Sequence, residues 1–149
     1  MKSRVAFSRT LPMLLALLVW VGANPPSRAA QMRMSDKDVE QLMKNMEQDS
    51  KKFQSLFGSA ISKSVIRKTS LEREARRLVD TFQKGSKTLY DHFKHTKKGD
   101  PYLQNSLDAA ARIDKFLHTN QLDADTNAQW AKVRKELTEL AVAFNMPAH

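Results

Sequence analysis

The sequence predicts an all-α protein, an antiparallel up-down-up-down four-helix bundle that follows an N-terminal signal peptide. Three observations support this fold class. In four successive segments of the 149-residue chain, apolar residues recur at steps of three and four, as on one face of a helix. Connections of about 3 to 5 residues separate the segments, and connections this short make successive helices antiparallel. No segment shows the alternation of a half-buried strand or an Asn-Gly hairpin signal.

The first 29 residues have the order of an export signal. Basic residues precede the apolar run 11–21, and a Ser-Arg-Ala triplet ends at Ala29. A signal peptidase substrate requires a positive start, a short apolar segment and small residues before the cut. We expect cleavage after Ala29, with cleavage after Ala23 or retention as an N-terminal anchor as alternatives. The apolar run is shorter than the roughly 20 residues that cross a bilayer, so we expect no transmembrane span after cleavage.

Residues 30–149 are then expected to form a single helical-bundle domain in an exported protein, periplasmic or secreted. A domain usually contains roughly 100 to 200 residues, which leaves room for one core. The chain contains no cysteine. This excludes a disulfide framework, a thiolate metal site, covalently attached c-type haem and a bacterial lipoprotein anchor.

The first helix is predicted over about 36–66. Ser35 and Asp38 resemble a capping box in which Asp replaces Glu. Apolar residues then follow one stripe from Val39 to Val65. Gly58 lies inside the pattern and costs roughly 1 kcal/mol relative to Ala, so a kink or a break is an alternative to one continuous helix.

The second helix is predicted from a second capping box, Thr69 with Glu72, and its stripe runs from Leu71 to Phe93. Cations followed by Gly99 are expected to stop it. Gly85 lies on the stripe itself. It either lets a neighbouring helix approach closely or is a weak spot without a role.

The third and fourth helices complete the bundle. Asp100 is expected to cap the third helix with Pro101 at its first position, and Asn120 is expected to end it in the left-handed conformation. Asp123 or Asp125 is expected to cap the fourth, which ends before the C-terminal proline. At 1.5 Å per residue the first two helices reach ~40 to 46 Å and the last two ~28 to 33 Å, so the first hairpin should project or bend.

The last third of the chain resembles a known class of protein. Residues 110–116, together with Trp130, Val133 and Leu137, look like the C-terminal hairpin of exported bacterial helical proteins of unassigned function. Residues 78–82 are similar as well, so the likeness extends over the mature chain. The matching residues are mainly packing positions, and the resemblance implies fold and export only, with no activity.

No catalytic or cofactor-binding residue is predicted, and we expect the protein not to be an enzyme. The sequence lacks a Ser-His-Asp arrangement, a Gly-rich phosphate loop and a carboxylate pair with an identifiable pocket. His92 and His95 lie on one helical face, but two imidazoles without a third ligand make a poor metal site. Asp114 and His118 are expected to form a pair on a helix surface.

The alternative function is a metal- or haem-binding periplasmic bundle that uses His92, His95, His118 or Met43. Haem would need an axial ligand on an opposing helix, and the last helix has no histidine before His149. We therefore expect Met43 and Met46 to fill the core, since flexible thioethers pack irregular gaps. No cofactor is expected.

Charge is distributed unevenly along the chain. Residues 51–98 contain 13 Lys and Arg against 4 Asp and Glu, whereas residues 30–50 and 99–149 are each slightly negative. The cations concentrate on the first hairpin. Five of them cluster around its tip and form the candidate anion-binding surface: Arg67, Lys68, Arg73, Arg76 and Arg77.

A basic protrusion attracts anions within a Debye length, ~8 to 10 Å at physiological salt. For an exported protein these anions are anionic lipid, a cell-wall polymer or an acidic protein. Nucleic acid is not expected, because no aromatic platform interleaves the cations. The sequence thus favours a non-enzymatic interaction protein, with a merely solvated basic face as the alternative.

Overall fold

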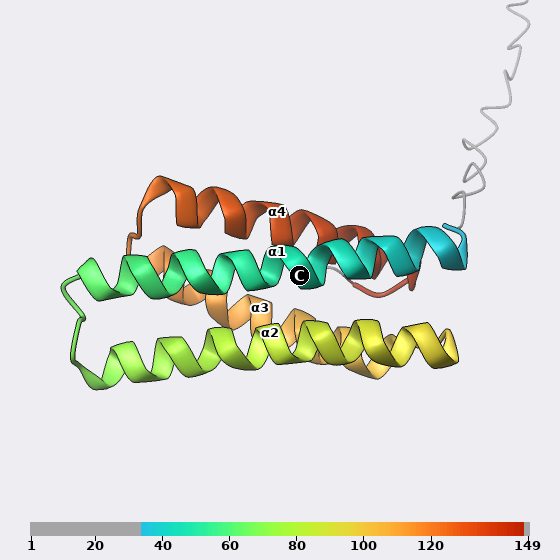
Figure 1. The fold of residues 1–149 in the computed structure, drawn as a ribbon, viewed down its shortest axis with the longest axis horizontal. Coiled ribbons are helices and arrows are strands. Elements are labelled where there is room, and N and C mark those ends of the chain that lie inside the picture. The colour runs from blue at the N-terminus through green and yellow to red at the C-terminus, as the bar shows by residue number, and fades with distance from the viewer. Residues whose placement is uncertain (1–33, 148–149) are drawn as a thin grey trace, which may run out of the picture. The chain divides into compact units, whose positions relative to one another are not determined.

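The computed structural model describes residues 34–147, and the expected signal peptide lies outside them. Four helices follow one another: α1 (Asp36–Lys63), α2 (Ser70–Thr96), α3 (Asp100–Thr119) and α4 (Ala124–Ala143). Within residues 34–147 there is no strand. Successive helices run antiparallel, as Figure 1 shows, so the all-α four-helix bundle is confirmed.

The four helices do not contact one another equally. α1 packs extensively against both α2 and α4, and α2 packs against α3, whereas the contact between α3 and α4 is the smallest of the four. α3 therefore depends on α2 for most of its attachment. None of the helices in the described part of the chain is long and apolar enough to span a membrane.

Side-chain caps begin three of the helices at residues predicted to do so. The hydroxyl oxygens of Ser35 and Thr69 accept hydrogen bonds from the N–H groups of Asp38 and Glu72. Of the two candidates for α4, Asp123 is the cap. Each cap satisfies an N–H group that the first turn of a helix leaves without a backbone partner.

Several helix ends differ from the prediction. α1 stops at Lys63, because the Ser64 N–H and hydroxyl both bond to the Ile61 carbonyl and the backbone turns extended there. Val65 is therefore fully exposed and does not belong to the stripe. Lys97, with φ 56°, takes the left-handed position that ends α2.

The boundaries of α3 also correct two expectations. Gly99 is the N-cap and makes no side-chain cap bond, so Asp100 is the first helical residue and Pro101 follows it. Asn120 is extended, with φ −119°, and does not end α3 in the left-handed conformation. Its side-chain amide instead donates to the Phe116 carbonyl oxygen at 3.1 Å, which satisfies one of the last carbonyls of the helix.

The core consists of the predicted stripes closed around one interior. An aromatic cluster lies at its centre: the ring centroid of Trp130 is 4.7 Å from that of Phe53 and 5.3 Å from that of Phe82. These rings come from α4, α1 and α2, so the cluster joins three helices. Met43 and Met46 are fully buried. Leu71, predicted on the stripe of α2, is instead 38% exposed.

Two glycines inside helices have distinct surroundings. α1 continues through Gly58 without a break. At Gly85 on α2, an added Cβ would lie 3.6 Å from the Ser106 Oγ on α3, an ordinary contact distance. α2 and α3 thus approach each other at Gly85, although an alanine at this position would also fit.

The two hairpins differ in length, as predicted. α1 and α2 have 28 and 27 residues, whereas α3 and α4 have 20 each. Figure 1 shows that the connection between α1 and α2 extends beyond the connection between α3 and α4 at the same end of the bundle. The first hairpin therefore projects, and its tip is residues 64–77.

Phe53→Ala tests the aromatic cluster. Phe53 is fully buried, and its removal should lower the free energy of unfolding by about 3 to 5 kcal/mol, the usual cost of truncating a buried Phe. Chemical denaturation measures this loss. Val65→Ala, at a fully exposed position, is the control and should change stability by less than about 0.5 kcal/mol. Equal effects of the two changes would contradict a core centred on Phe53.

Candidate functional site

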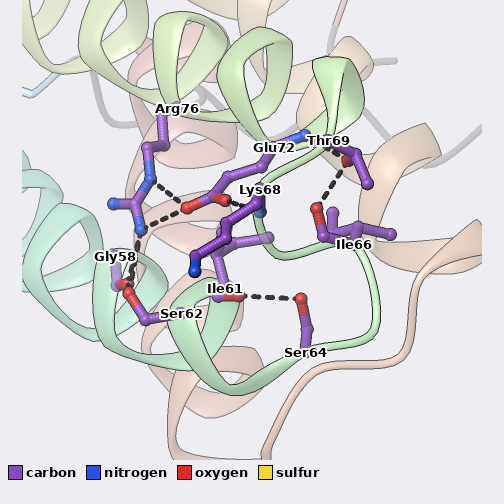
Figure 2. Close-up of polar contacts among 9 residues, drawn as sticks. All are labelled: Gly58, Ile61, Ser62, Ser64, Ile66, Lys68, Thr69, Glu72 and Arg76. Atoms are coloured by element: carbon purple, nitrogen blue, oxygen red, sulfur yellow. Dashed lines mark hydrogen bonds and ion pairs between the residues drawn. The ribbon is translucent and has the colours of Figure 1, made fainter.

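The hairpin tip is held in shape by hydrogen bonds within residues 64–72. The Thr69 hydroxyl donates to the Ile66 carbonyl at 2.5 Å, and the Lys68 N–H donates to the Glu72 carboxylate at 2.5 Å (Figure 2). Lys68 has φ 64°, an unusual backbone conformation for a residue with a side chain. The bond to Glu72 stabilises that conformation. In the predicted capping box the Glu72 carboxylate would accept from the Thr69 N–H, but it accepts from the N–H of Lys68, one residue earlier.

Arg76 connects the two helices of the hairpin. Its guanidinium donates to the Glu72 carboxylate at 2.9 Å, to the Gly58 carbonyl at 3.1 Å and to the Ser62 hydroxyl at 3.0 Å. Figure 2 shows these contacts converging on one guanidinium between α1 and α2. A Cβ at Gly58 would lie 3.2 Å from the Arg76 Nη1, so the glycine makes room for it. Arg76 therefore serves mainly the structure of the hairpin.

The other four candidate cations surround this connection and are exposed: Arg67, Lys68, Arg73 and Arg77. Within residues 34–147, no ion pair uses any of these four side chains. Glu72 accepts from the Lys68 N–H and from the Arg76 guanidinium, and the exposed Glu74 follows Arg73 in the chain. The N–H of Lys68, followed by the guanidiniums of Arg76 and Arg67, lowers the pKa of Glu72. The structure thus brings the predicted residues together, with Arg76 occupied and four cations facing solvent.

The histidines of the alternative metal site have other contacts. The His92 Nδ1 lies 2.8 Å from the Lys98 carbonyl oxygen, and its ring stacks on Tyr102 with centroids 4.4 Å apart. His95 and His118 are exposed. No group of three or more His, Cys, Asp or Glu side chains that could hold a metal ion occurs in residues 34–147.

Asp114 does not form the expected surface pair with His118. Its carboxylate accepts from the Trp130 Nε1 at 2.6 Å and pairs with the Arg134 Nε at 3.1 Å. Both partners lie on α4. Asp114 thus ties α3 to α4 where the contact between these helices is small, and it fixes the indole of the aromatic cluster.

A carboxyl pair between α1 and α4, with Glu136 buried and Asp49 half-buried, was not predicted. Asp49 on α1 pairs with the Lys132 Nζ at 2.7 Å and accepts from the Gln129 amide at 3.0 Å. Glu136 is 7% exposed and hydrogen-bonded to Asp49, and its Oε2 has no partner. The one sequence feature that indicates burial of Glu136 is its position next to Leu137, a residue of the apolar stripe. The residues that line the groove between α2 and α3 do not include this pair, which instead connects α1 to α4.

The two carboxyls of this pair have pKa values shifted in opposite directions, although burial alone would raise both. Burial first, and then the hydrogen bond and negative charge of Asp49, raise the pKa of Glu136 to about 8. Burial also opposes ionisation of Asp49, but hydrogen bonds from Lys132, Gln129 and Glu136 outweigh it and lower the pKa of Asp49. At neutral pH, Glu136 is therefore protonated and donates to an ionised Asp49.

Comparisons with known proteins do not add to this picture. No protein-family model matches the chain, and neither curated proteins nor solved structures provide a significant match. The candidate site therefore stands on its own geometry.

Glu136→Gln tests the shared proton. Because the pKa of Glu136 is raised on folding, its stabilising contribution is complete below about pH 4.5 and is lost as pH rises toward about 8. Glutamine keeps an N–H donor to Asp49 but does not ionise. Chemical denaturation at pH 5 and pH 8.5 should show the variant gaining stability relative to the native chain at the higher pH. The charges that face Glu136 are Asp49, Lys132 and Glu139.

The comparison of the two proteins removes the contribution of other titrating groups, since these are shared. A stability difference that is the same at pH 5 and pH 8.5 would contradict a protonated Glu136 in the native state.

Proposed function

We propose that this chain is a non-enzymatic exported interaction protein that binds an anionic envelope component or an acidic partner through the hairpin tip. One observation carries the proposal. Arg67, Lys68 and Arg73 are exposed at the projecting end of the bundle and have no carboxylate within ion-pairing distance among residues 34–147. Export follows from the signal-peptide pattern of residues 1–29.

The arrangement suits recognition of an anion for two physical reasons. Arg76 and Glu72 neutralise each other within α2, and Arg76 also bonds to the Gly58 carbonyl on α1, so the exposed cations are displayed on a fixed frame. Preorganised cations lose less conformational entropy on binding than cations on a mobile segment. In addition, a cluster of one sign raises the local concentration of anions and their rate of association.

The competing metal- or haem-binding function has weaker support in the geometry. His92 already contacts a carbonyl, and its Nδ1 faces Lys98 and Thr96. Met43 is fully buried in the apolar core, and its methyl group approaches the position that a side chain at Gly99 would occupy. The Met43 contact is that of a packing residue. The His92 contact leaves its Nε2 free, but no group of three or more His, Cys, Asp or Glu that could hold a metal ion occurs in residues 34–147. Absorption spectra and elemental analysis of protein from its own host would test this alternative.

The triple change Arg67→Glu, Lys68→Glu and Arg73→Glu tests the proposed function. The probe is a vesicle of phosphatidylglycerol in phosphatidylcholine, and binding is measured by sedimentation. The native chain should bind, and a rise from 50 to 200 mM salt should weaken binding by about tenfold or more, because screening acts directly on exposed charges. The triple variant should lose binding while its helix content is unchanged.

A matched control separates the tip from net charge. Lys44, Lys52 and Lys84 are exposed and outside the ion pairs of the described residues, so their replacement by Glu changes net charge equally. This control should keep most of the binding. Equal loss in both triple variants, or binding that does not depend on salt, would contradict recognition by the tip.

A further inference from the structure

A groove runs along the outer side of α2 and α3 and adjoins the hairpin tip. Its volume is about 1020 Å³. Small residues hollow it: Ala75 and Gly85 on α2, and Ala109 on α3. Leu71, Leu78 and Phe116 also line it, and they are exposed or only partly buried although they are large and apolar. The groove therefore has an apolar floor that nothing in the described chain covers.

Cations stand on both sides of this floor. Arg77 lies on α2, and Arg112 and Lys115 lie on α3. All three are exposed, and none takes part in an ion pair within the described residues. Two acids, Glu74 and Asp108, also line the groove, and Asp108 accepts from the Gln104 amide at 2.9 Å. The lining thus has three cations against two acids, and this excess of positive charge favours an occupant that carries carboxylates or other anions.

The net charge of the groove disfavours two occupants from the chain itself. Residues 1–33 contain five Lys and Arg and no acid, so this segment would place cations against cations. A second copy bound through the same face would bring the same excess of one positive charge, three cations against two acids, and so would not neutralise the groove. Like charges in an interface disfavour association. The complementary occupant is therefore another molecule.

We propose that the groove binds an acidic amphipathic helix of a partner protein. Such a helix has an apolar stripe flanked by Asp and Glu. The stripe complements the apolar floor, and the acids complement the cations beside it, which outnumber the two acids of the lining by one. The part of α2 that lines the groove, residues 71–88, spans about 26 Å, the length of roughly five helical turns. This inference rests on the proposed function. It specifies the acidic partner as a helix, and it extends the cationic surface of the hairpin tip into the groove through Arg77.

A helix fits this face better than a lipid surface does. The apolar side chains line a hollow between two helices, and a flat bilayer cannot follow that hollow. A narrow apolar stripe on a rod enters such a groove, with residues at every third or fourth position packed against the floor. Direct binding of the groove to vesicles is therefore an outcome that counts against the inference.

A synthetic peptide of about 18 residues serves as the probe, with Leu and Phe at helical spacing and Glu on both flanks. Its two controls are a scrambled peptide of identical composition and a peptide with Lys in place of Glu. Calorimetry with the full chain should show that the amphipathic acidic peptide binds at least about tenfold more tightly than either control. Equal affinity for the scrambled peptide would overturn the inference, because charge alone would then suffice.

Variants locate the peptide on the groove. Ala109→Phe fills the floor and should weaken binding about tenfold or more, whereas Ala111→Phe, at an exposed position of the same helix outside the groove, should not. If Ala109→Phe disturbs folding, the pair Arg112→Glu and Lys115→Glu tests the rim at exposed positions. Lys44→Glu with Lys52→Glu is its charge-matched control.

The outcomes distinguish this inference from the function on which it rests. Loss of peptide binding in the groove variants, with vesicle binding intact, supports both. Peptide binding that no groove variant changes overturns the groove, and so does vesicle binding that Arg112→Glu with Lys115→Glu abolishes. The tip variant Arg67→Glu, Lys68→Glu and Arg73→Glu tests the proposed function separately, since none of its three positions lines the groove.

Discussion

The contact of Phe53, Phe82 and Trp130 at the centre of the bundle is the interaction on which the rest of the structure depends. It joins α1, α2 and α4 through rings that are almost wholly buried. Aromatic pairs of this kind add to the stabilisation that comes from removing their area from water. Asp114 on α3 accepts from the indole N–H of Trp130 and so connects the fourth helix to the same cluster. With the helices fixed at the centre, the longer hairpin projects, and its connection displays Arg67 and Lys68.

The cations near that end of the bundle have two different roles. Arg76 is used internally, since its guanidinium bonds to Glu72 and to the Gly58 carbonyl across the hairpin. Arg73 and Arg77 are exposed beside it. The bonds of Arg76 give the hairpin a defined shape, and the exposed cations take part in no ion pair among residues 34–147. The resulting surface continues from the loop into the groove between α2 and α3.

The sequence predicts those features that local spacing determines. The four helices, the caps at Ser35, Thr69 and Asp123, and most of the buried stripe follow from the helical period and from side chains three residues apart. It does not predict features that depend on how two helices meet. The protonated Glu136 needs Asp49 from another helix, and the role of Arg76 needs the space at Gly58. The helical period of the apolar residues also predicts that α1 continues to Val65. In the structure α1 has already ended at Lys63, where Ser64 bonds to the Ile61 carbonyl.

The central claim is that the exposed cations of the first hairpin and its groove form one surface that recognises an acidic partner. Backbone chemical shifts of the isotopically labelled chain, recorded during titration with an acidic amphipathic peptide, test it most directly. The account predicts that the largest shifts fall within residues 67–88 and 102–116 and leave the opposite face, between α1 and α4, unchanged. Shifts spread evenly over the bundle, or centred on α1 and α4, would contradict it.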